Sequence, residues 1–219
     1  MGWHDRGFKP CADQTGKFSM DAKMLAAMIG LAFLGVAVPG QAQLGQNNGE
    51  SFLTAVREAN ANKAIALAEG TGSTVVNYRG AKGEAAMHIA TRRRDSSWIG
   101  FLAQHGADMN VADDRGETPL LIAARLGWLE GTRLLLAVGA GVDRTNRLGE
   151  TALIVAVQAR QPLVVRALLE NGANADKRDS AAGYSARDYA RRDSRSVELV
   201  RMMDSVKSTK KSVSGPVLK

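Results

Sequence analysis

The chain has 219 residues, of which 45% are apolar and 23% charged, a composition typical of a soluble folded protein. Lys and Arg outnumber Asp and Glu by 29 to 22, which gives a formal net charge of +7. The single cysteine, Cys11, excludes an intrachain disulfide, and three histidines leave little from which to build a zinc site. Collagen, mucin, disulfide-scaffold and polytopic-membrane classes are therefore excluded.

Residues 1–42 are predicted to be an N-terminal extension and signal peptide. Residues 24–38 read MLAAMIGLAFLGVAV, which is shorter than the roughly 20 apolar residues of a membrane span and typical of a secretory signal. Lys17 and Lys23 lie before this segment, and small residues favour cleavage after Ala42. The prediction is export to the periplasm, with no membrane contact after cleavage.

Alternatives for this segment stay open. It could be an uncleaved signal that anchors the chain in the inner membrane, or a buried apolar helix. The stretch before residue 20 is long and polar for a signal peptide, so translation could start at Met20 or Met24 instead of Met1.

The positive charge lies partly at the C-terminal end. Residues 207–219 carry four lysines and no acidic residue, and we predict a basic disordered tail. Residues 43–206 keep 21 basic and 19 acidic residues, a net charge of only +2. The basic character of the whole chain therefore does not predict nucleic-acid binding.

Residues between these two ends repeat with a period of 33, which indicates a repeat architecture. Glycines, Asn or Asp side chains and leucines recur at this step, with one glycine step of 34. The repeating positions are Gly83, Gly116, Gly149 and Gly183; Asn77, Asn110, Asp143 and Asp176; and Leu102, Leu135 and Leu168.

The clearest repeat begins at Gly116 and predicts a pair of helices. Thr118 can cap the first helix and Pro119 can occupy its first turn, where no amide donor is missed. Gly127 can adopt the left-handed conformation that ends this helix, and residues 129–138 are expected to form the second. One such pair cannot bury its apolar face alone, so neighbouring units must stack.

These residues resemble the repeats of ankyrin-repeat proteins. The resemblance is carried by Thr118-Pro119-Leu120, Ala123-Ala124, Leu134-Leu135 and Gly139-Ala140, with a second copy from Gly149 and a weaker one from Gly83. It implies an all-α solenoid of stacked antiparallel helix pairs joined by extended finger loops. We expect a domain over 43–206 with five units, at about 48–79, 80–112, 113–145, 146–179 and 180–206, of which the two atypical end units act as caps.

No catalytic, cofactor or metal site is predicted. The family pattern places His88 as a structural residue near the start of a helix, and His105 lies near the end of another. Asp108, Asp113 and Asp114 lack the ligand spacing of a calcium loop and are better explained as turn caps. The protein is therefore expected not to be an enzyme and to need no cofactor.

An arginine stripe is the sharpest candidate for a functional surface. Arg92, Arg125 and Gln158 are 33 residues apart and Arg192 follows after 34, at a position that in ankyrin repeats borders the concave groove. Solvated helix ends are the simpler explanation of such charges. The predicted partner-binding surface consists of Arg79, Lys82, Arg92, Arg93, Arg115, Glu117, Arg125, Leu126, Arg147, Leu148, Gln158, Tyr184 and Arg192, with Tyr184 as an exposed interface anchor.

The resemblance implies a non-enzymatic, monomeric module that binds a protein partner, of unknown identity and of acidic character, through its concave face and finger loops. The alternative is a binder of anionic surfaces or nucleic acid that uses the arginines and the lysine tail. Phosphate binding needs a strongly basic face, so the +2 of residues 43–206 disfavours this alternative, and no nucleic acid is expected as a partner.

Overall fold

The computed structural model describes residues 40–71 and 73–212, all within one compact unit, so most of the predicted signal peptide lies outside them. Every regular element among these residues is helical. The elements are α1 (Gly40–Arg57), α2 (Ala61–Thr71), α3 (Ser73–Val76), the 3-10 turn η1 (Ala81–Gly83), α4 (Ala86–Arg92), α5 (Ser96–Gln104), α6 (Pro119–Arg125), α7 (Leu129–Ala137), α8 (Ala152–Gln158), α9 (Pro162–Glu170), α10 (Ala186–Arg192) and α11 (Val197–Ser212).

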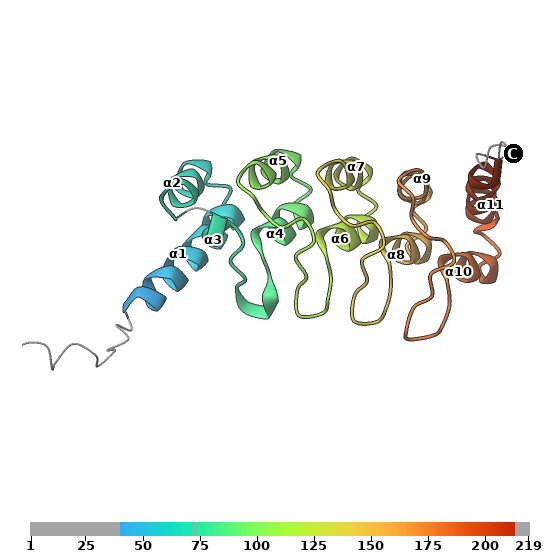
Figure 1. Cartoon of the computed structure of the whole chain (residues 1–219), viewed down its shortest axis with the longest axis horizontal. Coiled ribbons are helices and arrows are strands. Elements are labelled where there is room, and N and C mark those ends of the chain that lie inside the picture. Colours follow the sequence, from blue (N-terminus) through green and yellow to red (C-terminus); the bar gives the residue numbers. More distant parts are fainter. Residues whose placement is uncertain (1–39, 72, 213–219) are drawn as a thin grey trace, which may run out of the picture. The chain divides into compact units, whose positions relative to one another are not determined.

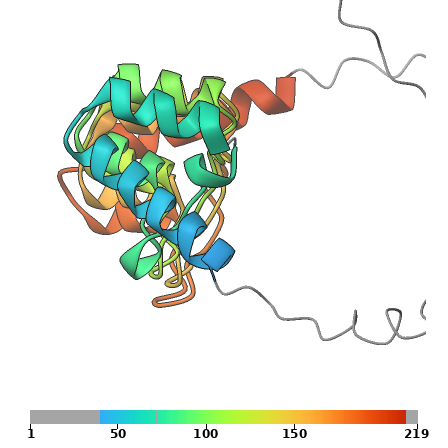
Figure 2. The same ribbon diagram turned by 90° about the vertical axis from the view of Figure 1, so that its left-hand side faces the viewer.

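The helices form two rows (Figure 1). The inner row is α1, α4, α6, α8 and α10, each packing on its neighbours. The outer row is α2, α5, α7, α9 and α11, in which the helices from α5 to α11 pack on one another in order. Finger loops join each outer helix to the next inner helix and lie one behind another when viewed along the rows (Figure 2). The described residues contain only isolated β-bridges, Thr145 with Thr151 and Arg178 with Ser185, so the predicted all-α solenoid is confirmed.

Polar side chains start the inner helices as the repeat predicts. The Thr118 hydroxyl accepts the Leu121 N–H at 3.5 Å, and Pro119 follows in the first turn. Thr151 and Ser185 cap α8 and α10 in the same way. These caps fix where α6, α8 and α10 begin, and therefore where the finger loops before them end.

The buried positions follow the period. Leu102, Leu135 and Leu168, one on each of three successive outer helices, are fully buried. Ala123 and Ala124 on α6 are also fully buried, and their small side chains let the inner helices approach closely. The core is therefore one continuous layer between the two rows and across all units.

Both ends of the described chain differ from the predicted boundaries. Helix α1 begins at Gly40, directly after Pro39 in the sequence and before both the expected first unit and the cleavage site after Ala42. Helix α11 continues to Ser212, which corrects the prediction of disorder for residues 207–212. The stretch from Val197 to Ser212 contains neither Gly nor Pro, so nothing in it ends the helix early.

Two leucines test the register of the repeat. Leu135 is fully buried and Leu148 is 54% exposed at a finger tip. We expect Leu135→Ala to lower the free energy of unfolding by about 2–5 kcal/mol, since it leaves a cavity. Leu148→Ala should change it by less than about 0.5 kcal/mol. Urea unfolding of both variants checks this, and equal losses would contradict the arrangement.

Candidate protein-interaction groove

Buried Asx side chains shape the turn of each finger loop. The Asp113 carboxylate accepts the N–H groups of Arg115 and Glu117 at 2.8 and 2.9 Å. One repeat later the Asn146 side chain accepts the N–H groups of Leu148 and Glu150, both at 3.0 Å. The prediction that Asp113 caps a turn is confirmed. These contacts place one side chain at the finger tip and direct the following glutamate toward the inner helix.

Neighbouring finger loops are joined through their backbones. The N–H groups of Asp114, Arg147 and Ser180 donate to the carbonyl oxygens of Lys82, Arg115 and Leu148 at 3.0, 3.0 and 2.8 Å. Gly116 has φ +76°, and a Cβ there would lie 2.8 Å from the Arg147 nitrogen, so glycine is required for this close approach. The finger tips therefore form a row held at one spacing.

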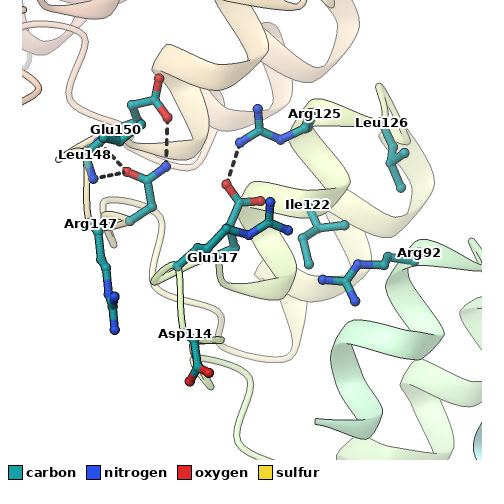
Figure 3. Close-up of a pocket in the computed structure, with 11 residues that line it drawn as sticks. Arg92, Asp114, Glu117, Ile122, Arg125, Leu126, Arg147, Leu148 and Glu150 are labelled. Atoms are coloured by element: carbon teal, nitrogen blue, oxygen red, sulfur yellow. Dashed lines mark hydrogen bonds and ion pairs between the residues drawn. The ribbon is translucent and has the colours of Figure 1, made fainter. Parts of the chain in front are cut away.

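A groove of about 700 Å³ crosses α6 between two of these finger loops, residues 105–118 and 138–151 (Figure 3). Ile122 and Leu126 on the α6 side and Leu148 on the finger side supply its apolar lining. Seven predicted surface residues come together here: Arg92, Arg115, Glu117, Arg125, Leu126, Arg147 and Leu148. The other lining residues are Asp114, Ile122, Asn146 and Glu150.

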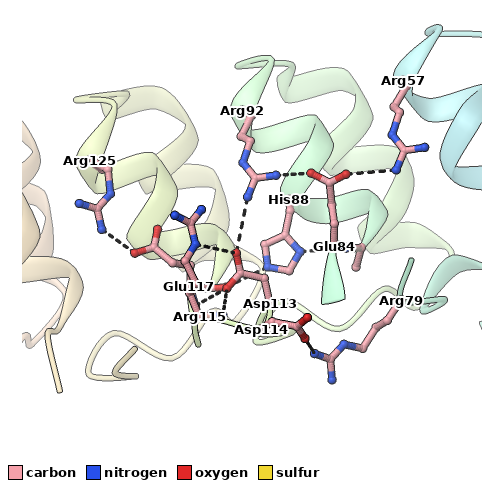
Figure 4. A network of polar contacts seen from close by, with 11 residues as sticks. Arg57, Arg79, Glu84, His88, Arg92, Asp113, Asp114, Arg115, Glu117 and Arg125 are labelled. Atoms are coloured by element: carbon pink, nitrogen blue, oxygen red, sulfur yellow. Dashed lines mark hydrogen bonds and ion pairs between the residues drawn. The ribbon is translucent and has the colours of Figure 1, made fainter. Parts of the chain in front are cut away.

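Two arginines of the stripe, Arg92 and Arg125, are ion-paired within the chain (Figure 4). Arg92 pairs with Glu84 and also lies 3.6 Å from the carboxylate of Asp113. Arg125 donates to Glu117 at 2.5 Å. Arg92 and Arg125 each end an inner helix and reach the glutamate of the finger loop before it, so their positive charge is compensated locally.

The partner of each stripe arginine lies eight positions earlier in the sequence. Glu84 with Arg92 and Glu117 with Arg125 are the two ion pairs at this spacing. In the last unit Arg192 donates to the Tyr184 hydroxyl at 2.9 Å, and its guanidinium carbon lies 4.6 Å from the ring centroid. Tyr184 is consequently half-buried against Arg192, which corrects its prediction as an exposed anchor.

The remaining predicted residues lie outside the groove. Lys82 lines an adjoining cavity of about 570 Å³, and Arg79 lies near it, 3.8 Å from Asp114. Arg93 donates to the backbone carbonyls of Val56 and Arg57 at 3.0 and 2.5 Å. It therefore links the second unit to the first and does not face the groove. Gln158, Tyr184 and Arg192 do not line the groove either.

The predicted set of surface residues left out Asn146 and Glu150, which line the groove, and Glu84, which lines the adjoining cavity. A signal was present, because a Gly-Glu dipeptide recurs at 83–84, 116–117 and 149–150, always eight residues before the stripe position. Opposite charges at a constant spacing in a stacked repeat predict a row of intramolecular pairs.

His88 has the structural role that the sequence predicts. Its Nδ1 accepts the Ala85 N–H at 3.0 Å and its Nε2 donates to the Glu117 carbonyl at 2.9 Å, so the ring joins two units (Figure 4). Burial lowers the pKa of His88 below its usual 6.5, and this outweighs the opposing effects of the Glu117 carbonyl and the Asp113 carboxylate.

The lowered pKa of His88 predicts a pH-dependent stability. Below about pH 6.5 the unfolded chain takes up the proton more readily than the folded chain. Neutral His88 therefore makes its full contribution to the free energy of unfolding above that pH. This contribution is lost as the pH falls through the folded-state pKa of His88. Urea unfolding between about pH 5 and 7.5 should show a flatter stability profile for His88→Gln than for the parent chain. An unchanged profile would exclude His88 as the source.

Comparison with known families agrees with this architecture. Residues 87–179 match the family model described as ankyrin repeats (3 copies). The match supports an ankyrin-repeat protein and establishes the fold as an all-α ankyrin solenoid. Ankyrin repeats indicate a protein-interaction module, in a family that generally serves as a non-enzymatic scaffold.

Two further findings concern the described residues alone. None of their helices is both long enough and apolar enough to cross a bilayer. Among the same residues, no three His, Cys, Asp or Glu side chains come together in a way that could hold a metal ion.

Proposed function

We propose that this chain is a non-enzymatic scaffold, exported to the periplasm of a Gram-negative bacterium, that binds a protein partner in the groove across α6. The observation that carries the proposal is the groove itself, which gathers seven of the predicted surface residues in one concave site. Binding sites of this kind combine an apolar lining with a few polar groups that orient the ligand.

The groove has this composition. Leu148 is 54% exposed on the finger side and Leu126 is half-buried on the α6 side, so both walls of the groove offer apolar surface to a partner. Arg115 and Arg147 project from neighbouring finger tips, and the Arg115 side chain is 79% exposed. Charged groups at such a rim mainly steer association and orient the partner, while the apolar centre supplies affinity.

The ion pairs weigh against a general binder of anionic surfaces or nucleic acid. The stripe arginines Arg92 and Arg125 each contact a carboxylate of their own unit, which removes much of the positive field that phosphate binding needs. Arg115 lies 4.0 Å from Asp113, so acidic groups of a partner would meet a basic side chain with no ion pair among the described residues chiefly at Arg147.

Site-specific crosslinking tests the groove in cells. A photoreactive amino acid at position 148 should crosslink to a protein partner, because this side chain lies exposed beside the groove. The matched control is position 163, which is 61% exposed at the start of outer helix α9. Protein crosslinks from position 148 and none from position 163 are expected, and equal yields from the two positions would contradict the proposal.

Export is tested separately by the N-terminus of the protein recovered from the periplasmic fraction. We expect the mature chain to begin near Gln43, since the proposed cleavage follows Ala42. N-terminal sequencing, or the intact mass, gives the answer directly. A product that remains in the membrane fraction with residues 1–42 intact would support the anchored alternative instead.

A further inference from the structure

The row of pairs at a spacing of eight residues is interrupted once, beside the groove. Glu84 and Glu117 each receive the arginine eight positions later, whereas the residue eight positions after Glu150 is Gln158. We propose that Glu150 is the subsite for an arginine side chain of the partner, which occupies the place that Gln158 leaves open. This inference rests on the proposed function and names the partner chemistry that the groove selects.

The Glu150 carboxylate is placed to accept such a group. It lines the groove, and Asn146 donates to one of its oxygens at 2.8 Å (Figure 3). Among the described residues it makes no ion pair, while the nearby Arg125 is bonded to Glu117. Its remaining acceptor positions are thus available to a guanidinium, which binds carboxylates with directed N–H groups.

Gln158 cannot take the role of the missing arginine. Its side chain is shorter and carries no charge, and it interacts with Tyr189 of the following inner helix. Tyr189 in turn donates to the Asp179 carboxylate at 2.6 Å, so these contacts engage Gln158 with unit five and not with the groove. Because glutamine and not arginine stands at position 158, the Glu150 carboxylate at the edge of the groove has no cation from its own unit.

The surroundings of Glu150 define the rest of the partner segment. Leu148 offers apolar contact, and Arg147 lies beside it with no ion pair among the described residues. An extended partner segment can satisfy these three groove residues together. It would place an arginine against Glu150, an apolar side chain against Leu148 and an acidic side chain toward Arg147. The partner is therefore a mixed-charge peptide segment and not a uniformly acidic one.

The test restores an arginine at position 158, where it can pair with Glu150 and compete with the partner. A random linear peptide library displayed on phage is selected on the full chain, and the affinities of the selected peptides are measured for Gln158→Arg. This variant restores the pair at Glu150 and should weaken binding roughly tenfold or more, since it removes a charge-assisted contact. Gln104→Arg makes the same change at the exposed end of outer helix α5 and should bind like the parent chain.

A matching change in the peptide completes a double-mutant cycle between position 158 of the chain and the peptide arginine. Replacing the peptide arginine by citrulline, which keeps the shape and removes the charge, should weaken binding to the parent chain by a similar factor. The same replacement should have little further effect on Gln158→Arg, because the two changes remove one interaction. Thermal melts of both chain variants establish that the losses do not arise from unfolding.

The outcomes separate this inference from the proposed function. Peptides that are blocked by Leu148→Asp yet bind Gln158→Arg as tightly as the parent chain would preserve the groove as a binding site and overturn the role of Glu150. If no selected peptide is blocked by Leu148→Asp, the groove does not bind linear segments. The proposed function then fails for this class of ligand, and the inference fails with it.

Discussion

Stacking in register is the constraint on which the rest of this structure depends. A unit whose inner helix has seven residues and whose outer helix has nine cannot bury an apolar face by itself, so each unit is stable only against its neighbours. The buried leucines, the close-packed alanines and the backbone hydrogen bonds between finger loops all serve this contact. Stacking at a constant step places equivalent residues of successive units side by side.

The charge of the concave side follows from the same constraint. A residue type that recurs every 33 positions becomes a row on the surface, and two such rows eight residues apart in sequence lie within ion-pairing distance. Glu84 with Arg92 and Glu117 with Arg125 neutralise each other in this way. The row of pairs is interrupted where Gln158, and not an arginine, stands eight residues after Glu150.

The sequence predicted those features that depend on periodicity and local chemistry. Thr118 as a cap, Leu135 in the core and the structural role of His88 were all accessible from the repeat. The direction of long side chains could not be predicted from the repeat, because Arg92 and Arg93 are adjacent in sequence but contact different units. Helix ends at Gly40 and Ser212 were missed because composition suggested a processing site and a soluble tail, and neither excludes a helix.

Double-mutant cycles on unfolding free energies test the central claim that Glu117 engages Arg125 while Glu150 stays open. One cycle combines Arg125→Gln with Glu117→Gln, and the other combines Arg125→Gln with Glu150→Gln. The account predicts a favourable coupling of about 0.2–1 kcal/mol in the first cycle, as expected for a partly exposed pair, and coupling within error of zero in the second. Equal coupling in the two cycles, or coupling only to Glu150, would contradict it.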